Sequence, residues 1–147
     1  MTLDEIKDMW KTDCQIDDIE LDKSSLEVPK LHAKYSELLT DNSLRLKQLN
    51  LKYQIALKDK WMYFNGKMDD DTIREKGWNL APLDGLKVLK NDLHIFFNAD
   101  EELQKMNAQV EYYKEVDAFL KRCMENITWR HQTIRNTIDW RKFMAGS

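Results

Sequence analysis

Residues 103–141 have the sequence LQKMNAQVEYYKEVDAFLKRCMENITWRHQTIRNTIDWR. One set of positions in this stretch recurs at alternating steps of three and four, which is the heptad spacing of a helix that packs along a single seam. At about 1.5 Å per residue the helix reaches on the order of 60 Å, and it is not expected to bury its seam alone. We expect the seam to pack partly within the chain and partly against another copy. Its members are Leu103, Met106, Val110, Tyr113, Asp117, Leu120, Met124, Ile127, His131, Ile134, Ile138 and Arg141.

A second helical pattern begins near Ser24 and ends at Asn65-Gly66, where glycine suits the left-handed position that follows a helix. Pro29 is harmless if the helix begins nearby and kinks the helix if it begins earlier. Two apolar stripes run along this helix, and both have to be buried. We expect one to pack within the chain and the other against a partner or a second copy. The first stripe comprises Leu31, Tyr35, Leu38, Asn42, Leu46, Leu49, Tyr53 and Ala56. The second comprises Leu44, Leu51, Ile55 and Met62.

The remaining segments predict short elements. Thr2 and Glu5 form a capping box, which predicts a first helix over about residues 2–13. Residues 68–85 begin as a polar loop and continue as irregular structure with one short irregular or β element. Asn98 is the expected N-cap of the last helix. Between these two segments another helix is predicted, with apolar positions at Leu86, Leu89, Leu93 and Phe96.

Together these patterns predict a mainly all-α chain, a long helical hairpin with a C-terminal coiled-coil-like helix. We expect a single helical domain over residues 1–147, with 1–97 as its N-terminal part and 98–147 as its C-terminal region. Four glycines and two prolines are too few for the turns of a β sandwich or barrel. Plentiful leucine, isoleucine and aromatic residues argue against a disordered chain. No uncharged run is long enough to span a membrane, and the acidic start of the chain argues against a signal peptide.

Two cysteines and an uneven charge distribution complete the composition. Cys14 and Cys123 lie far apart, as is typical of reduced thiols in a cytosol. The net charge of −3 conceals four blocks of alternating sign. Solvated helix faces are the simplest interpretation, but a basic block rich in aromatics can also hold a nucleic-acid backbone. Opposite blocks can also complement each other between subunits. The blocks are −6 over residues 1–29, +5 over 30–67, −6 over 68–118 and +4 over 119–147.

No motif for catalysis, a cofactor or a metal stands out. The chain has no Gly-rich phosphate loop, no His-Glu-x-x-His and no Cys-x-x-Cys. No histidine has a glutamate three residues before it, as a di-iron bundle would require. The run Asp69-Asp70-Asp71 lacks the spaced ligands of a calcium loop, so we expect a solvated loop there. His131 is expected to be a packed or interfacial polar residue, and we expect the protein not to be an enzyme.

The segment over residues 57–64 combines cations with aromatic rings. It places Lys58 and Lys60 beside Trp61, Tyr63 and Phe64. Lysines neutralise phosphates and aromatic rings stack on bases, and single-stranded DNA needs both. Alternatively the aromatics belong to the core and the lysines only flank it. At about 100° per residue the two lysines point roughly 200° apart on a regular helix. They can contact the same DNA strand only if their side chains bend around the helix, if the helix frays there, or if neighbouring copies complete the surface.

The segment over residues 55–67, IALKDKWMYFNGK, resembles the central motif of the UvsY family, the recombination mediators of T-even-like phages. The beginning of the chain, with Asp13 and Ile16-Asp17, and its end over residues 134–146, IRNTIDWRKFMAG, are also similar to that family. Residues 68–110 match poorly. The family's basic pair falls on Lys58 and Lys60, where lysine replaces arginine at position 60 and keeps the charge without the bidentate geometry.

The resemblance implies a small helical protein without enzymatic activity that assembles into a ring-like homo-oligomer, a hexamer or heptamer. It implies binding to single-stranded DNA, to a RecA-like phage recombinase and to the phage single-stranded-DNA-binding protein, in recombination, repair and recombination-dependent replication. The expected location is the cytoplasm of the infected bacterial host. The DNA-binding candidates are Lys58, Lys60, Trp61, Tyr63 and Lys67. The oligomerisation candidates are Leu120, Met124, Ile127, Ile134 and Ile138.

Two alternatives stay open at this point. A helical oligomeric adaptor or assembly chaperone without nucleic-acid binding would show the same helices and multimer. If Lys58 and Lys60 are not the DNA contacts, the next basic cluster is the C-terminal one. It comprises Arg130, Arg135, Arg141 and Lys142.

Overall fold

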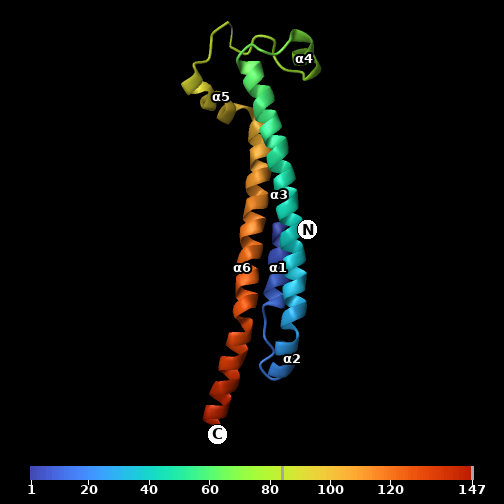
Figure 1. Cartoon of the computed structure of the whole chain (residues 1–147), viewed down its shortest axis with the longest axis vertical. Coiled ribbons are helices and arrows are strands. Elements are labelled where there is room, and N and C mark those ends of the chain that lie inside the picture. Colours follow the sequence, from blue (N-terminus) through green and yellow to red (C-terminus); the bar gives the residue numbers. More distant parts are fainter. Residues whose placement is uncertain (84, 147) are drawn as a thin grey trace. The chain divides into compact units, whose positions relative to one another are not determined.

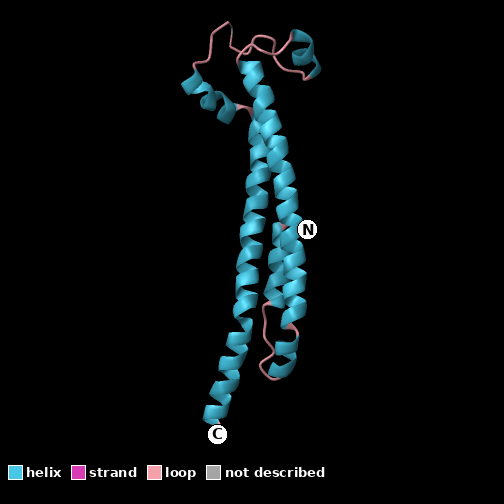
Figure 2. Cartoon of the chain, viewed as in Figure 1, coloured by secondary structure: helices cyan, strands magenta, loops and turns pink. Residues whose placement is uncertain are grey.

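A computed structural model of the chain describes residues 1–83 and 85–146, and every regular element in them is a helix (Figure 2). The predicted all-α class is confirmed, and the short element expected near residues 68–85 is helical rather than β. No helix in the described part is long and apolar enough to cross a membrane. The elements are α1 (Leu3–Asp13), α2 (Leu21–Leu26), α3 (Val28–Phe64), α4 (Asp70–Glu75), η1 (Lys90–Asp92), α5 (Leu93–Ala99) and α6 (Glu101–Met144).

The chain forms two compact units. Unit 1 comprises Met1–Leu44 and Tyr113–Ser147, and unit 2 comprises Arg45–Tyr112. The long helices α3 and α6 each contribute to both units, and they run antiparallel within each (Figure 1). The units therefore interleave along the sequence, a different division from the parts 1–97 and 98–147 that we predict from sequence.

Unit 1 has a core in which α1 packs against α3 and α6. Tyr35 of α3 is completely buried, and its ring meets Trp10 of α1 edge-on with centroids 5.0 Å apart. The Tyr35 hydroxyl donates to Asp13 Oδ2 at 3.0 Å. Burial and this hydrogen bond raise the pKa of Tyr35 well above its ordinary value. The buried core is Ile6, Tyr35, Val116, Leu120, Cys123 and Ile127.

The polar members of the two packing stripes meet inside unit 1. Asn42 Nδ2 donates to the carbonyl of Tyr113 at 3.1 Å, and the Ser43 hydroxyl donates to Asp117 Oδ1. The Lys121 ammonium lies 2.8 Å from Asp117 Oδ2. Burial raises the pKa of Asp117, but its hydrogen bonds with Lys121, Ser43 and Asn42 outweigh burial and hold the pKa below its ordinary value. Polar residues therefore interrupt the predicted seam because they pair with each other across the two helices.

Several helix ends follow the sequence signals. Thr2 and Glu5 form the expected capping box at the start of α1. Gly66 adopts a φ of +69°, and the N–H of Lys67 donates to the Met62 carbonyl at 2.8 Å, which completes a left-handed cap after α3.

Three expected boundaries are corrected. The helical pattern near Ser24 is a separate helix, α2, and α3 starts after a turn at Glu27, so Pro29 is its second residue and needs no N–H partner. The run from Asp69 is not a loop throughout, because Asp69 caps α4 by accepting from the N–H of Thr72 at 3.1 Å. Asp100, not Asn98, caps α6, since its Oδ1 accepts from the N–H of Leu103 at 3.0 Å.

Candidate nucleic-acid interface

The last turns of α3 present two chemically different sides. The side chain of Lys58 is 66% exposed, whereas that of Lys60 is only 6% exposed. Two residues along a helix rotate the side chain by about 200°, which is the separation that the sequence predicts for these lysines. The lysine pair of the motif therefore does not form one cationic surface.

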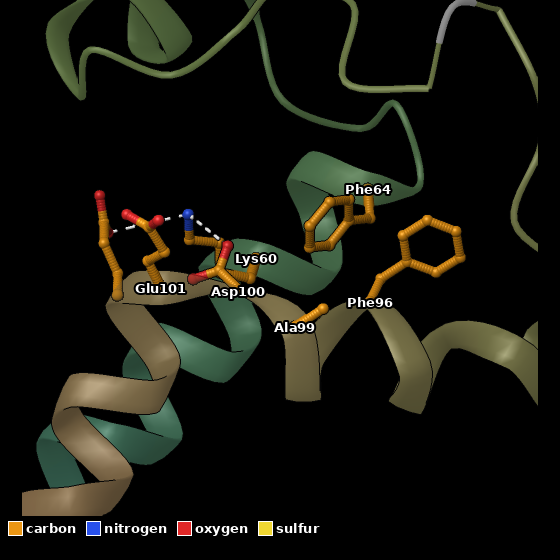
Figure 3. A pocket seen from close by; sticks show the side chains of 7 residues that line it. Lys60, Phe64, Phe96, Ala99, Asp100 and Glu101 are labelled. Carbon is orange, nitrogen blue, oxygen red and sulfur yellow. Dashed lines mark ion pairs between the residues drawn. The ribbon is translucent and has the colours of Figure 1, made fainter.

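Lys60 faces the start of α6 within unit 2. Its ammonium lies 2.9 Å from Asp100 Oδ2 and 3.8 Å from Glu102 Oε2. It also lies over the ring of Trp78, 3.8 Å from the centroid. Figure 3 shows the ammonium directed at the Asp100 carboxylate. Its charge is balanced inside the protein.

A shallow hollow of about 400 Å³ opens beside this ion pair. Its three carboxylates outnumber its single cation, so it repels a phosphate rather than binding one. The lining residues are Lys60, Phe64, Phe96, Ala99, Asp100, Glu101 and Glu102 (Figure 3).

Tyr63 also points inward. The residue is 7% exposed, and its hydroxyl donates to the carbonyl of Asn79. Burial and the charge of Asp100 raise its pKa, against the opposing effect of the Asn79 hydrogen bond. Its ring lies 4.9 Å from that of Trp78 and 5.2 Å from that of Phe64. The structure thus gives Tyr63 a packing position rather than a surface for base stacking.

The opposite side of α3 is open and basic. Trp61 is 40% exposed, and the Lys67 ammonium lies over its ring, 4.5 Å from the centroid. Lys58 lies on the same side one turn earlier, with Asp59 Oδ1 3.5 Å from its ammonium. Exposed Lys47 shares this side three turns earlier, because eleven residues bring a helix back to within about 20°. We call Lys58, Trp61 and Lys67 the Lys58 face.

The Lys58 face has the components that a single strand of DNA requires. Cations on one side of a helix track a phosphate backbone, and an exposed indole stacks on any base. Asp59 weakens the local positive potential, but its other oxygen lies 3.6 Å from the ammonium of Lys76. No group of three or more His, Cys, Asp or Glu side chains able to hold a metal occurs in the described residues.

The sequence pattern of the family described as "Recombination, repair and ssDNA binding protein UvsY" matches residues 9–147. The chain belongs to the UvsY family. No curated protein sequence matches it.

Solved structures show the same fold. Three crystal structures of the bacteriophage T4 recombination mediator protein UvsY superpose on the chain, in lattice types II, IV and I. The first has a TM-score of 0.86 at 21% identity and covers 99% of this chain and 98% of the T4 chain. The second has a TM-score of 0.80 at 19% identity, with coverage of 98% and 99%. The third has 0.82 at 19% identity, with coverage of 95% and 98%.

In this UvsY family member, the seam residues expected to form contacts between copies are used inside the chain. Leu120, Ile127 and Ile134 are each at most 2% exposed. Met124 is half-buried against the core of unit 1, and Ile138 is also half-buried. A second copy reaches the three buried side chains only if the core opens, so they are poor candidates for contacts between folded subunits.

Of the C-terminal basic cluster, Arg130 is a structural residue. It is 7% exposed, and its guanidinium donates to the carbonyls of Cys14 at 3.0 Å and Gln15 at 2.6 Å. It thereby holds the end of α1 to α6. Arg141 is directed toward Asp18, with 3.7 Å between their charged atoms.

An aromatic surface that the heptad spacing does not indicate lies on the other side of α6 from the seam. The rings of Trp140 and Phe143 stack with centroids 5.7 Å apart. Trp129 and Trp140 are eleven residues apart, which brings them to within about 20° of one helix side. That spacing is the signal in the sequence that indicates their shared side. This α6 aromatic face consists of Trp129, Trp140, Phe143 and Met144, all at least 61% exposed.

Proposed function

We propose that this chain is a recombination mediator that binds single-stranded DNA through the Lys58 face. It helps a RecA-like recombinase to form its filament on DNA covered by a single-stranded-DNA-binding protein, in the cytoplasm of an infected bacterium. Membership of the UvsY family supports this role. The observation that carries the site is the Lys67 ammonium over the exposed ring of Trp61, with Lys58 on the same side of α3.

Lys60 and Tyr63, which the sequence predicts as part of the DNA site, are less suited to direct contact with DNA. Both side chains are buried in unit 2 with polar partners of their own. Lys58, Trp61 and Lys67 are therefore the residues that we propose to touch DNA.

We further propose that the protein acts as a ring of identical copies. A ring needs head-to-tail contacts between two different surfaces of each copy. Two exposed apolar surfaces support this, the α6 aromatic face and a stripe on α3. This α3 stripe consists of Leu51 and Ile55, each at least 59% exposed. Repeating one small basic face around a ring makes each later DNA contact intramolecular, which explains how a chain of net charge −3 can hold a polyanion.

A fluorescence titration of labelled oligo(dT) at several salt concentrations tests the DNA-binding role. The variant Lys58→Ala/Lys67→Ala should bind more weakly, with a salt slope flatter by about 1.4 per subunit engaged, because each phosphate contact on a single strand contributes about 0.7. Lys105→Ala, which removes an exposed lysine from α6, is the matched control and should bind like the wild type.

Two results would count against this site or role. An unchanged slope in the double variant would move the DNA site away from α3. A wild-type protein that binds no single strand at low salt would leave the helical adaptor without nucleic-acid binding as the better interpretation.

A further inference from the structure

Lys60 occupies a position of the family motif at which a DNA contact is expected, yet its surroundings are those of a structural ion pair. The ammonium meets Asp100 at 2.9 Å, Glu102 at 3.8 Å and the face of Trp78 at 3.8 Å. A carboxylate on one side and an aromatic face on the other satisfy a buried ammonium. For Lys60 to reach a phosphate, it would have to leave these partners and expose the Asp100 carboxylate to the DNA.

The partners of Lys60 come from different elements of unit 2. Asp100 separates α5 from α6 and caps α6, and Glu102 belongs to the first turn of α6. Trp78 follows α4, and its indole N–H donates to Glu102 Oε1 at 2.8 Å. The hydroxyl of Tyr63, one turn from Lys60 on α3, donates to the carbonyl of Asn79 beside Trp78. One ammonium therefore ties the end of α3, the segment after α4 and the first turn of α6 together.

The same last turns of α3 carry the Lys58 face on their other side. Lys58 precedes Lys60 by two residues, Trp61 follows it directly, and Lys67 follows the cap at Gly66. The path of the chain out of α3 decides whether Lys67 reaches the ring of Trp61. The buried contacts of Lys60 therefore position the exposed residues of the Lys58 face.

The geometry points to different roles for the two lysines. Lys58 contacts DNA, whereas Lys60 is a positioning residue that fixes the end of α3 through its ion pair with Asp100, which we call the clasp. The DNA part of this inference rests on the proposed function. The clasp itself is a property of the fold and can be tested without DNA.

Four variants separate the two roles. Lys60→Met keeps the length of the side chain and removes its charge, which leaves the Asp100 carboxylate without the counter-ion at its Oδ2. Adding Asp100→Asn removes that unpaired charge and retains a good N-cap residue. Asp100→Asn alone completes a double-mutant cycle with these two variants and the wild type. Lys58→Met is the control, which removes an exposed lysine from the same helix.

Thermal unfolding followed by circular dichroism tests whether the clasp stabilises the fold. Lys60→Met should lower the melting temperature, and adding Asp100→Asn should restore most of the loss. Lys58→Met should leave the melting temperature unchanged. The clasp would be contradicted if Lys60→Met did not lower the melting temperature, or if Lys60→Met/Asp100→Asn lowered it as much as Lys60→Met does.

The salt dependence of oligo(dT) binding tests which of the two lysines contacts phosphate. Lys58→Met should flatten the slope by about 0.7 per subunit engaged, whereas Lys60→Met/Asp100→Asn should keep the wild-type slope. The affinity of the same double variant for oligo(dT) should lie within about twofold of the affinity of Asp100→Asn alone. An equal flattening in both lysine variants would show that Lys60 is a phosphate ligand and would overturn the inference.

The double variant also keeps the inference testable if Lys60→Met fails to fold, because it contains no unpaired buried charge. If the wild type binds no DNA, the proposed function fails. The melting cycle then decides the clasp by itself.

Discussion

Asp117 is a carboxylate held inside the helical core of unit 1 by three different donors. Its side chain is 11% exposed and accepts from Ser43, from Asn42 at 3.4 Å and from Lys121 at 2.8 Å. A buried charge is tolerated when it is paired and hydrogen-bonded. Because α3 and α6 supply partners that must lie opposite each other, this cluster favours one register of the two helices over its neighbours.

Replacing Asp117 with alanine should lower the free energy of unfolding by about 1–3 kcal/mol at pH 7, because Asn42 and Ser43 lose a buried acceptor. The pKa of folded Asp117 lies below its ordinary value of 3.8. Its stabilising effect is therefore complete above that value and disappears as the pH falls through the lower folded pKa. Urea unfolding between pH 7 and pH 2 should show the difference in stability between the wild type and the variant shrinking as the pH falls below 3.8.

The matched control is Asp71→Ala, whose side chain is 90% exposed in α4. This variant should unfold like the wild type at pH 7. A difference between the wild type and Asp117→Ala that stays constant down to the lowest pH would show that packing, not the carboxylate, provides the stability.

At the scale of single elements, helix ends are set by local chemistry. The end of α3 depends on Gly66, whose φ of +69° most residues with a side chain adopt only under strain. The break between α5 and α6 depends on Asp100, which serves both as the cap of α6 and as the partner of Lys60. An ion pair that includes a helix cap couples a local boundary to a tertiary contact.

Gly66→Ala should destabilise the protein by about 1 kcal/mol, since the left-handed conformation disfavours a Cβ even though no other atom lies within 4 Å of it. Gly66→Asn should cost less, because asparagine tolerates that conformation. Urea unfolding of both variants measures the difference. Equal losses for alanine and asparagine would indicate that the cap conformation is not the cause.

At the scale of the whole molecule, apolar surface remains after the chain has folded. The α3 stripe and the α6 aromatic face are both uncovered, although the seam of α6 is buried within the chain. Large aromatic residues on a surface mark contacts with other proteins. Head-to-tail assembly of copies would use one such surface to cover the other.

Head-to-tail assembly makes a specific prediction for mixtures. A variant with Leu51→Ser/Ile55→Ser loses one surface, and a variant with Trp140→Ser/Phe143→Ser loses the other. Each alone should be monomeric in light scattering, because neither can contact another copy of itself. Mixed in equal amounts, they should form a dimer and no larger species, since one intact surface of each kind remains.

Folding of each variant is checked by circular dichroism before mixing. If the two variants stay monomeric together but the wild type is a multimer, copies contact each other through like surfaces or through other residues. A monomeric wild type at micromolar concentration would contradict the ring itself.

Sequence patterns alone predict the helical class, the two long helices, the start of α1 and the end of α3. These follow from apolar spacing and from capping residues such as Thr2, Glu5 and Gly66, whose effects act within a turn of the chain. The opposed directions of Lys58 and Lys60 were also predictable, because helical rotation alone decides them.

Which side of each helix is covered depends on tertiary contacts. Lys60 is internal because Trp78 and Asp100, remote in sequence, lie against it, and no local pattern announces such partners. The seam through Leu120 and Ile127 is filled by the chain's own core, which leaves the α6 aromatic face exposed instead. Periodicity shows that a helix face is apolar, but burial depends on what packs against it, and that depends on contacts between distant parts of the chain.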